Sequence, residues 1–152
     1  GGLSVVLNSQ TDIVRSFVTW AGVSNPDRFS SRQKEEWRKE GVFNVLNART
    51  NQLMSMSVNF LNDLEENLGG RLNIKNVLSK NIKPYLIIQG EQDLAVKVRE
   101  AENLYGWTKE NAQLEILPGT GHTFDAVHPF KEESENLKKV LNKTIKFIEE
   151  II

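Results

Sequence analysis

The chain has 152 residues, 39% of them hydrophobic, and a formal net charge of −1, which allows one ordinary core and gives no electrostatic reason to expect binding to nucleic acid or an anionic membrane. It contains no cysteine, so disulfides and thiolate metal sites are excluded, while the redox compartment stays open. No apolar run is long enough to span a bilayer and no signal peptide is recognisable, so the localisation is unknown, with a soluble cytoplasmic protein as the preferred expectation.

The start of the chain predicts a short helix followed by a buried strand. Leu3, Val6 and Leu7 share one helical face, and the polar residues 8–10 end that helix. Residues 16–22 are rich in aromatic and β-branched side chains and stop at a glycine, a pattern typical of a buried strand.

Residues 28–83 are too long for a simple crossover connection, and their periodicity is weak, so we expect an insertion. Within it, residues 42–46 and 53–56 flank a polar stretch at 47–51, which is compatible with a small hairpin. An amphipathic helix and a short helix would follow. The first carries Phe60, Leu61, Leu64 and Leu68 and ends at Gly69-Gly70, and the second carries Ile74, Val77 and Leu78 after a capping Asn73.

The same stretch predicts a polar helix at residues 31–40. Ser30 and Gln33 have the spacing of a capping box, and Gly41 is a stop signal. Trp37 is the only large apolar residue of this helix, so it is either the single anchor of the helix or a lid over a substrate cleft. We prefer the anchor, because burial is the commoner role of tryptophan.

The second half of the chain predicts two further strands. Residues 84–90 form an apolar run without polar alternation, which indicates a parallel strand buried on both faces, and residues 113–117 form another strand. Helices between and after these strands complete an α/β fold with parallel strands flanked by helices. The first helix carries Val98, Ala101, Leu104 and Tyr105 and ends at Gly106, with Trp107 packing beyond it, and the last carries Leu137, Val140, Leu141, Ile145, Ile148 and Ile152.

Two polar residues follow these strands, Asp93 after the first and His122 after the second. Parallel strands bring their carboxyl ends together, so the two side chains should meet at one edge of the sheet. That arrangement suits an orienting carboxylate and a general base. One alternative is an ordinary βαβ unit, in which Asp93 only caps a helix and His122 is an exposed loop residue. A second is that Glu91, the nearest rival acid, takes the place of Asp93.

A metal site is a weaker interpretation of the same region. His122, Asp125 and His128 carry zinc-binding side chains, but Pro129 and the glycines before His122 oppose the helical spacing that would bring them together. We therefore expect no metal, and expect His128-Pro129 to mark the start of the last helix.

Three motifs carry a resemblance to a known family. The segments IKPYLIIQGEQDLAV and LEILPGTGHTF resemble the acid and histidine motifs that close the α/β-hydrolase fold, especially in its dienelactone-hydrolase-like and prolyl-oligopeptidase-like branches. Gly1-Gly2-Leu3-Ser4 is similar to the tail of a Gly-His-Ser-x-Gly-Gly nucleophile elbow. By this resemblance the serine would lie just before Gly1, outside the chain.

The resemblance implies that residues 1–152 are the C-terminal portion of one α/β-hydrolase domain, with residues 28–83 as an insertion or cap-like segment. The complete protein would be a serine hydrolase for a small-molecule ester, amide or similar acyl substrate, without cofactor. Asp93 would orient His122, the base. The motifs do not choose among carboxylesterase, dienelactonase, acylaminopeptidase and thioesterase.

The serine and the first oxyanion donor would both precede Gly1. The N-terminal half of the same hydrolase is therefore the expected partner, and the chain alone should be inactive. Strand 16–22 would keep an unpaired apolar edge, which favours association with another chain, including a second copy of itself. The alternative is a non-catalytic α/β ligand-binding or interaction module, in which Asp93 and His122 only cap and pack.

Overall fold

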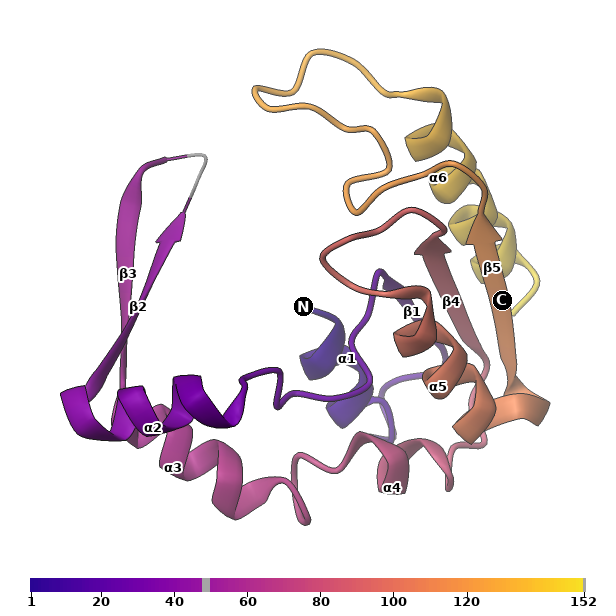
Figure 1. Ribbon diagram of the computed structural model, residues 1–152. Coiled ribbons are helices and arrows are strands. Elements are labelled where there is room, and N and C mark those ends of the chain that lie inside the picture. The colour runs from indigo at the N-terminus through magenta and orange to yellow at the C-terminus, as the bar shows by residue number, and fades with distance from the viewer. Residues whose placement is uncertain (48–49, 152) are drawn as a thin grey trace. The chain divides into compact units, whose positions relative to one another are not determined.

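The computed structural model describes residues 1–47 and 50–151, and the chain folds into two compact units. Unit 1 comprises Gly1–Asn25 and Ile74–Ile152, and unit 2 comprises Pro26–Asn73 (Figure 1). Within the described residues, no helix is long and apolar enough to cross a membrane.

Unit 1 contains a three-stranded parallel sheet. Its strands are β1 (Phe17–Trp20), β4 (Tyr85–Gly90) and β5 (Ala112–Leu117), in the order β1-β4-β5. Phe17 pairs with Tyr85, and Tyr85 pairs with Ala112, so all three strands run the same way. The predicted parallel sheet is confirmed.

The central strand β4 is buried along its whole length, as its unbroken apolar run predicts. Tyr85 and Ile87 face one core and Leu86 and Ile88 face another, because successive side chains of a strand point to opposite faces. The sheet is therefore covered on both faces, with α5 on one and α6 on the other (Figure 1). The helices of unit 1 are α1 (Gly2–Asn8), α4 (Ile74–Leu78), α5 (Val98–Thr108) and α6 (Glu135–Glu149), with a 3₁₀ turn η1 (Lys109–Asn111).

The helix α5 continues through Gly106, so the predicted stop there is wrong. A Cβ atom at Gly106 would meet nothing within 4 Å, which means that this glycine lies on an open face and costs only helix propensity. Leu104 and Thr108 are buried on the opposite side, and the Thr108 hydroxyl donates to the Leu104 carbonyl over 2.9 Å. Packing therefore overrides the glycine, and Trp107 is a partly buried helix residue.

The last helix begins later than predicted. It starts at Glu135 after the N-cap Ser134, and His128-Pro129 lies in the preceding loop. Its buried residues are Val140 and Phe147, seven positions apart, whereas the predicted Ile145 and Ile148 are exposed. The large ring of Phe147 decides which face is buried. Ile152, also predicted for this face, lies outside the described residues.

Unit 2 consists of α2 (Ser31–Glu40), β2 (Val42–Asn47), β3 (Gln52–Ser57) and α3 (Val58–Asn67). The predicted capping box of α2 is present, and Gly41 ends the helix at a φ of 73°. The two strands pair antiparallel as the predicted hairpin, of which Ala48 and Arg49 lie outside the described residues. The helix α3 buries Leu61 and Leu64.

Trp37 is fully buried in unit 2, which confirms the anchor interpretation. Its ring centroid lies 5.1 Å from that of Phe29, 5.1 Å from Phe43 and 6.0 Å from Phe60. Its indole N–H donates to the Met56 carbonyl over 3.0 Å. A single tryptophan therefore joins α2 to the strands β2 and β3 and to the helix α3.

Candidate active site

Asp93 and His122 follow the carboxyl ends of β4 and β5, which are neighbours in the sheet. The Nδ1 atom of His122 lies 2.8 Å from Oδ2 of Asp93, so the two side chains are hydrogen-bonded. The structure thus brings together the two residues that the sequence singles out, at the edge where parallel strands end.

Four donors surround the Asp93 carboxylate, whose side chain is completely buried. The backbone N–H groups of Ala95 and Val96 each donate to Oδ1 over 2.8 Å. Oδ2 accepts from His122 and, over 3.0 Å, from the Nε2 amide of Gln89. Four hydrogen bonds use the acceptor capacity of a carboxylate, so its orientation is fixed.

These contacts keep Asp93 ionised. Burial alone would raise the pKa of Asp93, but the hydrogen bonds from Val96, His122, Gln89 and Ala95 together outweigh it and leave the pKa below its usual value. A carboxylate in this state holds a proton on Nδ1 of His122 and stabilises the imidazolium form.

His122 is only partly covered, since its side chain is 48% exposed. With Nδ1 donating to Asp93, the lone pair of the ring is on Nε2. Such an imidazole can take a proton from a hydroxyl that reaches Nε2 and return it to a leaving group.

The loops that carry the two residues touch at Gly90, the last residue of β4. A Cβ atom at this position would lie 2.4 Å from the Thr120 carbonyl oxygen and 2.6 Å from that of Gly121. The backbone N–H of Gln92 donates to the same Thr120 oxygen over 2.9 Å. Only glycine allows this approach, and the approach sets the spacing of Asp93 and His122.

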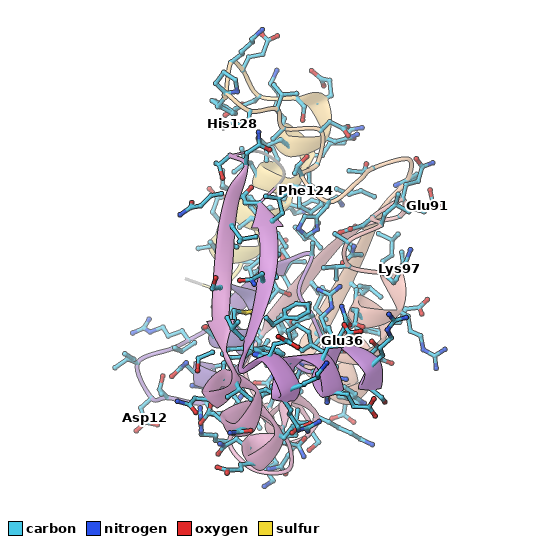
Figure 2. All side chains as sticks on the ribbon, turned by 60° about the vertical axis from the view of Figure 1, so that its left-hand side comes forward. Asp12, Glu36, Glu91, Lys97, Phe124 and His128 are labelled. Atoms are coloured by element: carbon cyan, nitrogen blue, oxygen red, sulfur yellow. The ribbon has the colours of Figure 1, made fainter. Side chains whose placement is uncertain are left out.

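Glu91, the rival acid, has a different role. Its Oε2 atom accepts from the backbone N–H of Gly119 over 2.9 Å, where Gly119 has a φ of 65°. Glu91 therefore holds the turn before His122, from the neighbouring loop (Figure 2).

The backbone after His122 is strained and tightly anchored. Phe124 and Asp125 both have positive φ angles, 52° and 62°, which are uncommon for residues with a side chain. Phe124, labelled in Figure 2, is buried. Its ring lies edge-on to that of Trp20, with 6.1 Å between the two ring centroids. The Ser134 hydroxyl donates to the Phe124 carbonyl over 2.6 Å, so the N-cap of α6 holds the histidine loop.

No metal site accompanies this arrangement in residues 1–47 and 50–151, where no group of three or more His, Asp and Glu side chains could hold an ion. Asp125 accepts instead from the Asn136 amide over 2.6 Å. His128 lies further along the loop (Figure 2).

A glycine contact also fixes the start of α1. A Cβ atom on Gly2 would lie 3.1 Å from the Cα atom of Gly22, directly after β1. Gly22 follows the carboxyl end of β1, which ends at Trp20, so the start of α1 lies beside that end of the strand. The first residues of the chain therefore share the sheet edge that carries Asp93 and His122.

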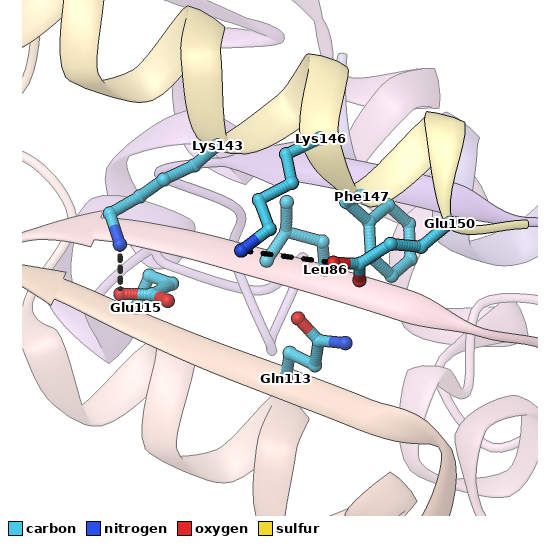
Figure 3. A pocket seen from close by; sticks show the side chains of 7 residues that line it. All are labelled: Leu86, Gln113, Glu115, Lys143, Lys146, Phe147 and Glu150. Atoms are coloured by element: carbon cyan, nitrogen blue, oxygen red, sulfur yellow. Dashed lines mark hydrogen bonds and ion pairs between the residues drawn. The ribbon is translucent and has the colours of Figure 1, made fainter.

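A separate pocket of about 130 Å³ lies between β5 and α6. It is polar, and its charged side chains pair with each other, Lys143 with Glu115 and Lys146 with Glu150 (Figure 3). None of its lining residues belongs to the loops of Asp93 and His122, so it is not part of the candidate active site.

Two site residues escape prediction from the sequence, Gln89 and Ser134. Gln89 carries a weak signal, because it is the one polar side chain in a strand that is otherwise apolar. Ser134 carries only the signal of a helix cap, and its contact with Phe124 depends on a loop geometry that the sequence pattern does not encode.

Comparison of the sequence with protein-family models and with curated proteins finds no match. Several solved structures are similar. Est1E from Butyrivibrio proteoclasticus has a TM-score of 0.66 at 22% identity, covering 99% of this chain and 57% of its own. A monoacylglycerol lipase from Paleococcus ferrophilus has a TM-score of 0.67 at 12% identity, covering 97% and 64%. The α/β hydrolase MGS-MChE2, from a metagenome of Mar Chica lagoon sediments in Morocco, has a TM-score of 0.58 at 19% identity, covering 96% and 57%.

These neighbours are α/β hydrolases, and the agreement in fold extends over nearly the whole chain. The chain thus has the fold of the C-terminal part of an α/β hydrolase, as the sequence predicts. It spans less than two thirds of the length of the structures it matches.

Proposed function

We propose that Asp93 and His122 are the acid and base of a Ser-His-Asp triad in a serine hydrolase. The observation that carries this proposal is the 2.8 Å hydrogen bond from Nδ1 of half-exposed His122 to the buried, ionised Asp93. This geometry fixes the tautomer that makes Nε2 a base. The serine stands just before Gly1, and the contact between Gly2 at the start of α1 and Gly22 after β1 supports it.

The reaction is hydrolysis of an ester, amide or similar acyl substrate, with an ester preferred because the similar structures include an esterase domain and a lipase. His122 takes the serine proton during acylation and gives it to the leaving group. It then activates water to hydrolyse the acyl-enzyme. The motifs around Asp93 and His122 support the dienelactone-hydrolase-like or prolyl-oligopeptidase-like branch.

Two parts of the proposal concern the rest of the protein. Residues 1–152 alone are inactive, because the serine and the adjacent oxyanion donor belong to the preceding half of the same protein. Unit 2 lies inside the predicted insertion at 28–83, apart from its first two residues, and acts as a cap-like segment that selects the substrate.

The test measures ester hydrolysis by the protein that includes the residues encoded before Gly1. p-Nitrophenyl butyrate serves as the general probe, and methyl ferulate as a second one, since Est1E has been solved with ferulic acid bound. We expect His122→Ala to lower kcat about 10⁶-fold and Asp93→Ala about 10⁴-fold. A fluorophosphonate probe should label one serine before Gly1.

Two outcomes would contradict the proposal. Rates that are indifferent to both substitutions would favour a non-catalytic ligand-binding or interaction module. Turnover by residues 1–152 that vanishes with His122→Ala would show that the nucleophile lies elsewhere.

A further inference from the structure

The Asp93 carboxylate has a neighbour that the triad does not explain, the amide of Gln89. This side chain is fully buried near the end of β4, on the face of the sheet covered by α5. Its Nε2 atom lies 2.9 Å from the Val96 carbonyl, 3.0 Å from Asp93 Oδ2 and 3.2 Å from the Gly90 carbonyl. All three neighbours are acceptors, so the nitrogen must face them.

Within residues 1–47 and 50–151, the oxygen end of this amide has no hydrogen-bond partner. No donor among the described residues reaches Oε1 of Gln89, although the atom is buried. An unpaired buried carbonyl oxygen is destabilising, and an apolar side chain of similar length would avoid it. The hydrogen bonds that the Gln89 nitrogen donates therefore explain why a glutamine stands at this position.

The Gln89 nitrogen closes a small ring of hydrogen bonds. It donates to Asp93 Oδ2 and to the Val96 carbonyl, while the Val96 N–H donates to Asp93 Oδ1. The strand that carries Gln89 is paired on both sides, by β1 and β5, so it is a rigid support. The loop that carries Asp93 is held by single backbone contacts, such as the Gln92 N–H to the Thr120 carbonyl, and Gln89 links its carboxylate directly to the paired strand.

We propose that Gln89 is a positioning residue for Asp93, whose amide fixes the carboxylate oxygen that accepts from His122. Without this donor, Oδ2 can turn away from Nδ1, and His122 loses the partner that sets its tautomer. The inference deepens the proposed hydrolase function and rests on it for its effect on turnover.

The test compares Gln89→Met and Gln89→Glu, with Gln113→Met as the matched control, in the protein that includes the residues before Gly1. Gln113 is exposed on the neighbouring strand β5, in the separate pocket (Figure 3). We expect Gln89→Met to lower kcat by roughly ten- to a hundredfold at unchanged KM, because the catalytic geometry loosens. The ¹³C resonance of the Asp93 carboxyl should titrate at higher pH, since a hydrogen bond to the charged form is lost.

Gln89→Glu places a second carboxylate beside Asp93 and should move that titration further upwards. Gln113→Met should change neither kcat nor the titration. In the unsubstituted protein, the Gln89 side-chain amide protons should be protected from exchange with water.

Wild-type kcat and an unchanged Asp93 titration in Gln89→Met would overturn the inference. If neither variant folds, rapid exchange of the Gln89 amide protons in the unsubstituted protein would overturn it as well, and protection would support it. Failure of the hydrolase proposal can be told apart from failure of this inference. If only the hydrolase proposal fails, His122→Ala leaves the activity unchanged, while Gln89→Met still shifts the titration of Asp93.

Discussion

The hydrogen bonds to Asp93 make its charge part of the stability of unit 1. Because the pKa of Asp93 is lower in the folded chain, its contribution is present in full above the unfolded value of about 3.9. The contribution is lost as the pH falls through the lower folded pKa. We expect Asp93→Asn to be less stable than wild type by about 1–3 kcal/mol at pH 7.

The difference in unfolding free energy between wild type and Asp93→Asn should become smaller as the pH falls below about 4. Urea unfolding at pH 7 and pH 3 measures it. An equal difference at both values would mean that the carboxylate is not favoured in its charged form by the fold.

A substitution at Gly90 tests the contact between the loops that carry Asp93 and His122. Gly90→Ala places a methyl group 2.4 Å from the Thr120 oxygen, so the histidine loop must move. We expect a loss of about 1–3 kcal/mol in unfolding free energy, together with a longer Asp93 to His122 distance and lower turnover. Gly106→Ala is the control, because its Cβ meets nothing within 4 Å. It should stabilise α5 by about 0.5–1 kcal/mol.

A crystal structure of Gly90→Ala would measure the distance directly. An unchanged 2.8 Å contact between Nδ1 and Oδ2 would show that the loop adjusts elsewhere.

The sequence predicts that Asp93 and His122 meet at one edge of the sheet because each follows the end of a strand, and the resemblance of their motifs to those of α/β hydrolases implies their roles. It does not predict Gln89, because a glutamine inside a buried strand is visible but its partners are not. Those partners are set by the turn of residues 93–96, in which two N–H groups point to one carboxylate oxygen. Contacts of this kind appear only once the chain is folded.

At the scale of elements, the N-cap of α6 is also a support for the site. Ser134 accepts from the Leu137 N–H over 3.0 Å and donates to the Phe124 carbonyl over 2.6 Å. Ser134→Ala should lower stability by about 1 kcal/mol and also lower kcat, because the strained histidine loop loses its anchor.

The matched control is Ser30→Ala, which removes the equivalent cap from α2 in unit 2. It should lower stability by a similar amount and leave the hydrogen bond between Asp93 and His122 unchanged. Thermal unfolding and the Nδ1 proton resonance of His122 measure the two effects. Equal effects of both variants on that resonance would mean that Ser134 acts only through stability.

Elements with a uniform pattern are predictable from the sequence, and elements decided by one large side chain are not. The buried run of β4 and the capping box of α2 are both confirmed. The end of α5 and the buried face of α6 are not predictable, because they depend on how Trp107 and Phe147 pack against the two cores that cover the sheet. The local preferences of Gly106 for a helix end and of Pro129 for a helix start therefore do not decide the helix bounds.

At the scale of the whole molecule, the long stretch between the first two strands of the sheet contains a compact unit with its own aromatic cluster. The rings of Phe29, Phe43 and Phe60 surround the buried Trp37 in this unit, and Leu61 and Leu64 are buried beside them in α3. The predicted insertion at 28–83 includes α4, which packs with unit 1 through Ile74 and Leu78. An apolar pattern marks a helix but does not say which of two cores the helix joins.

The edge of β1 provides the last prediction. Among the described residues, β1 pairs with β4 alone, and its Phe17 and Thr19 are buried. An apolar strand with an open edge readily pairs with another chain. In the proposed hydrolase, the residues before Gly1 supply the missing neighbour, so we expect residues 1–152 alone to self-associate at micromolar concentration. The longer protein should have a discrete size and a higher unfolding temperature, which light scattering after gel filtration and calorimetry measure. Residues 1–152 that stay monomeric and unfold at the same temperature as the longer protein would contradict both the open edge and the strand proposed to cover it.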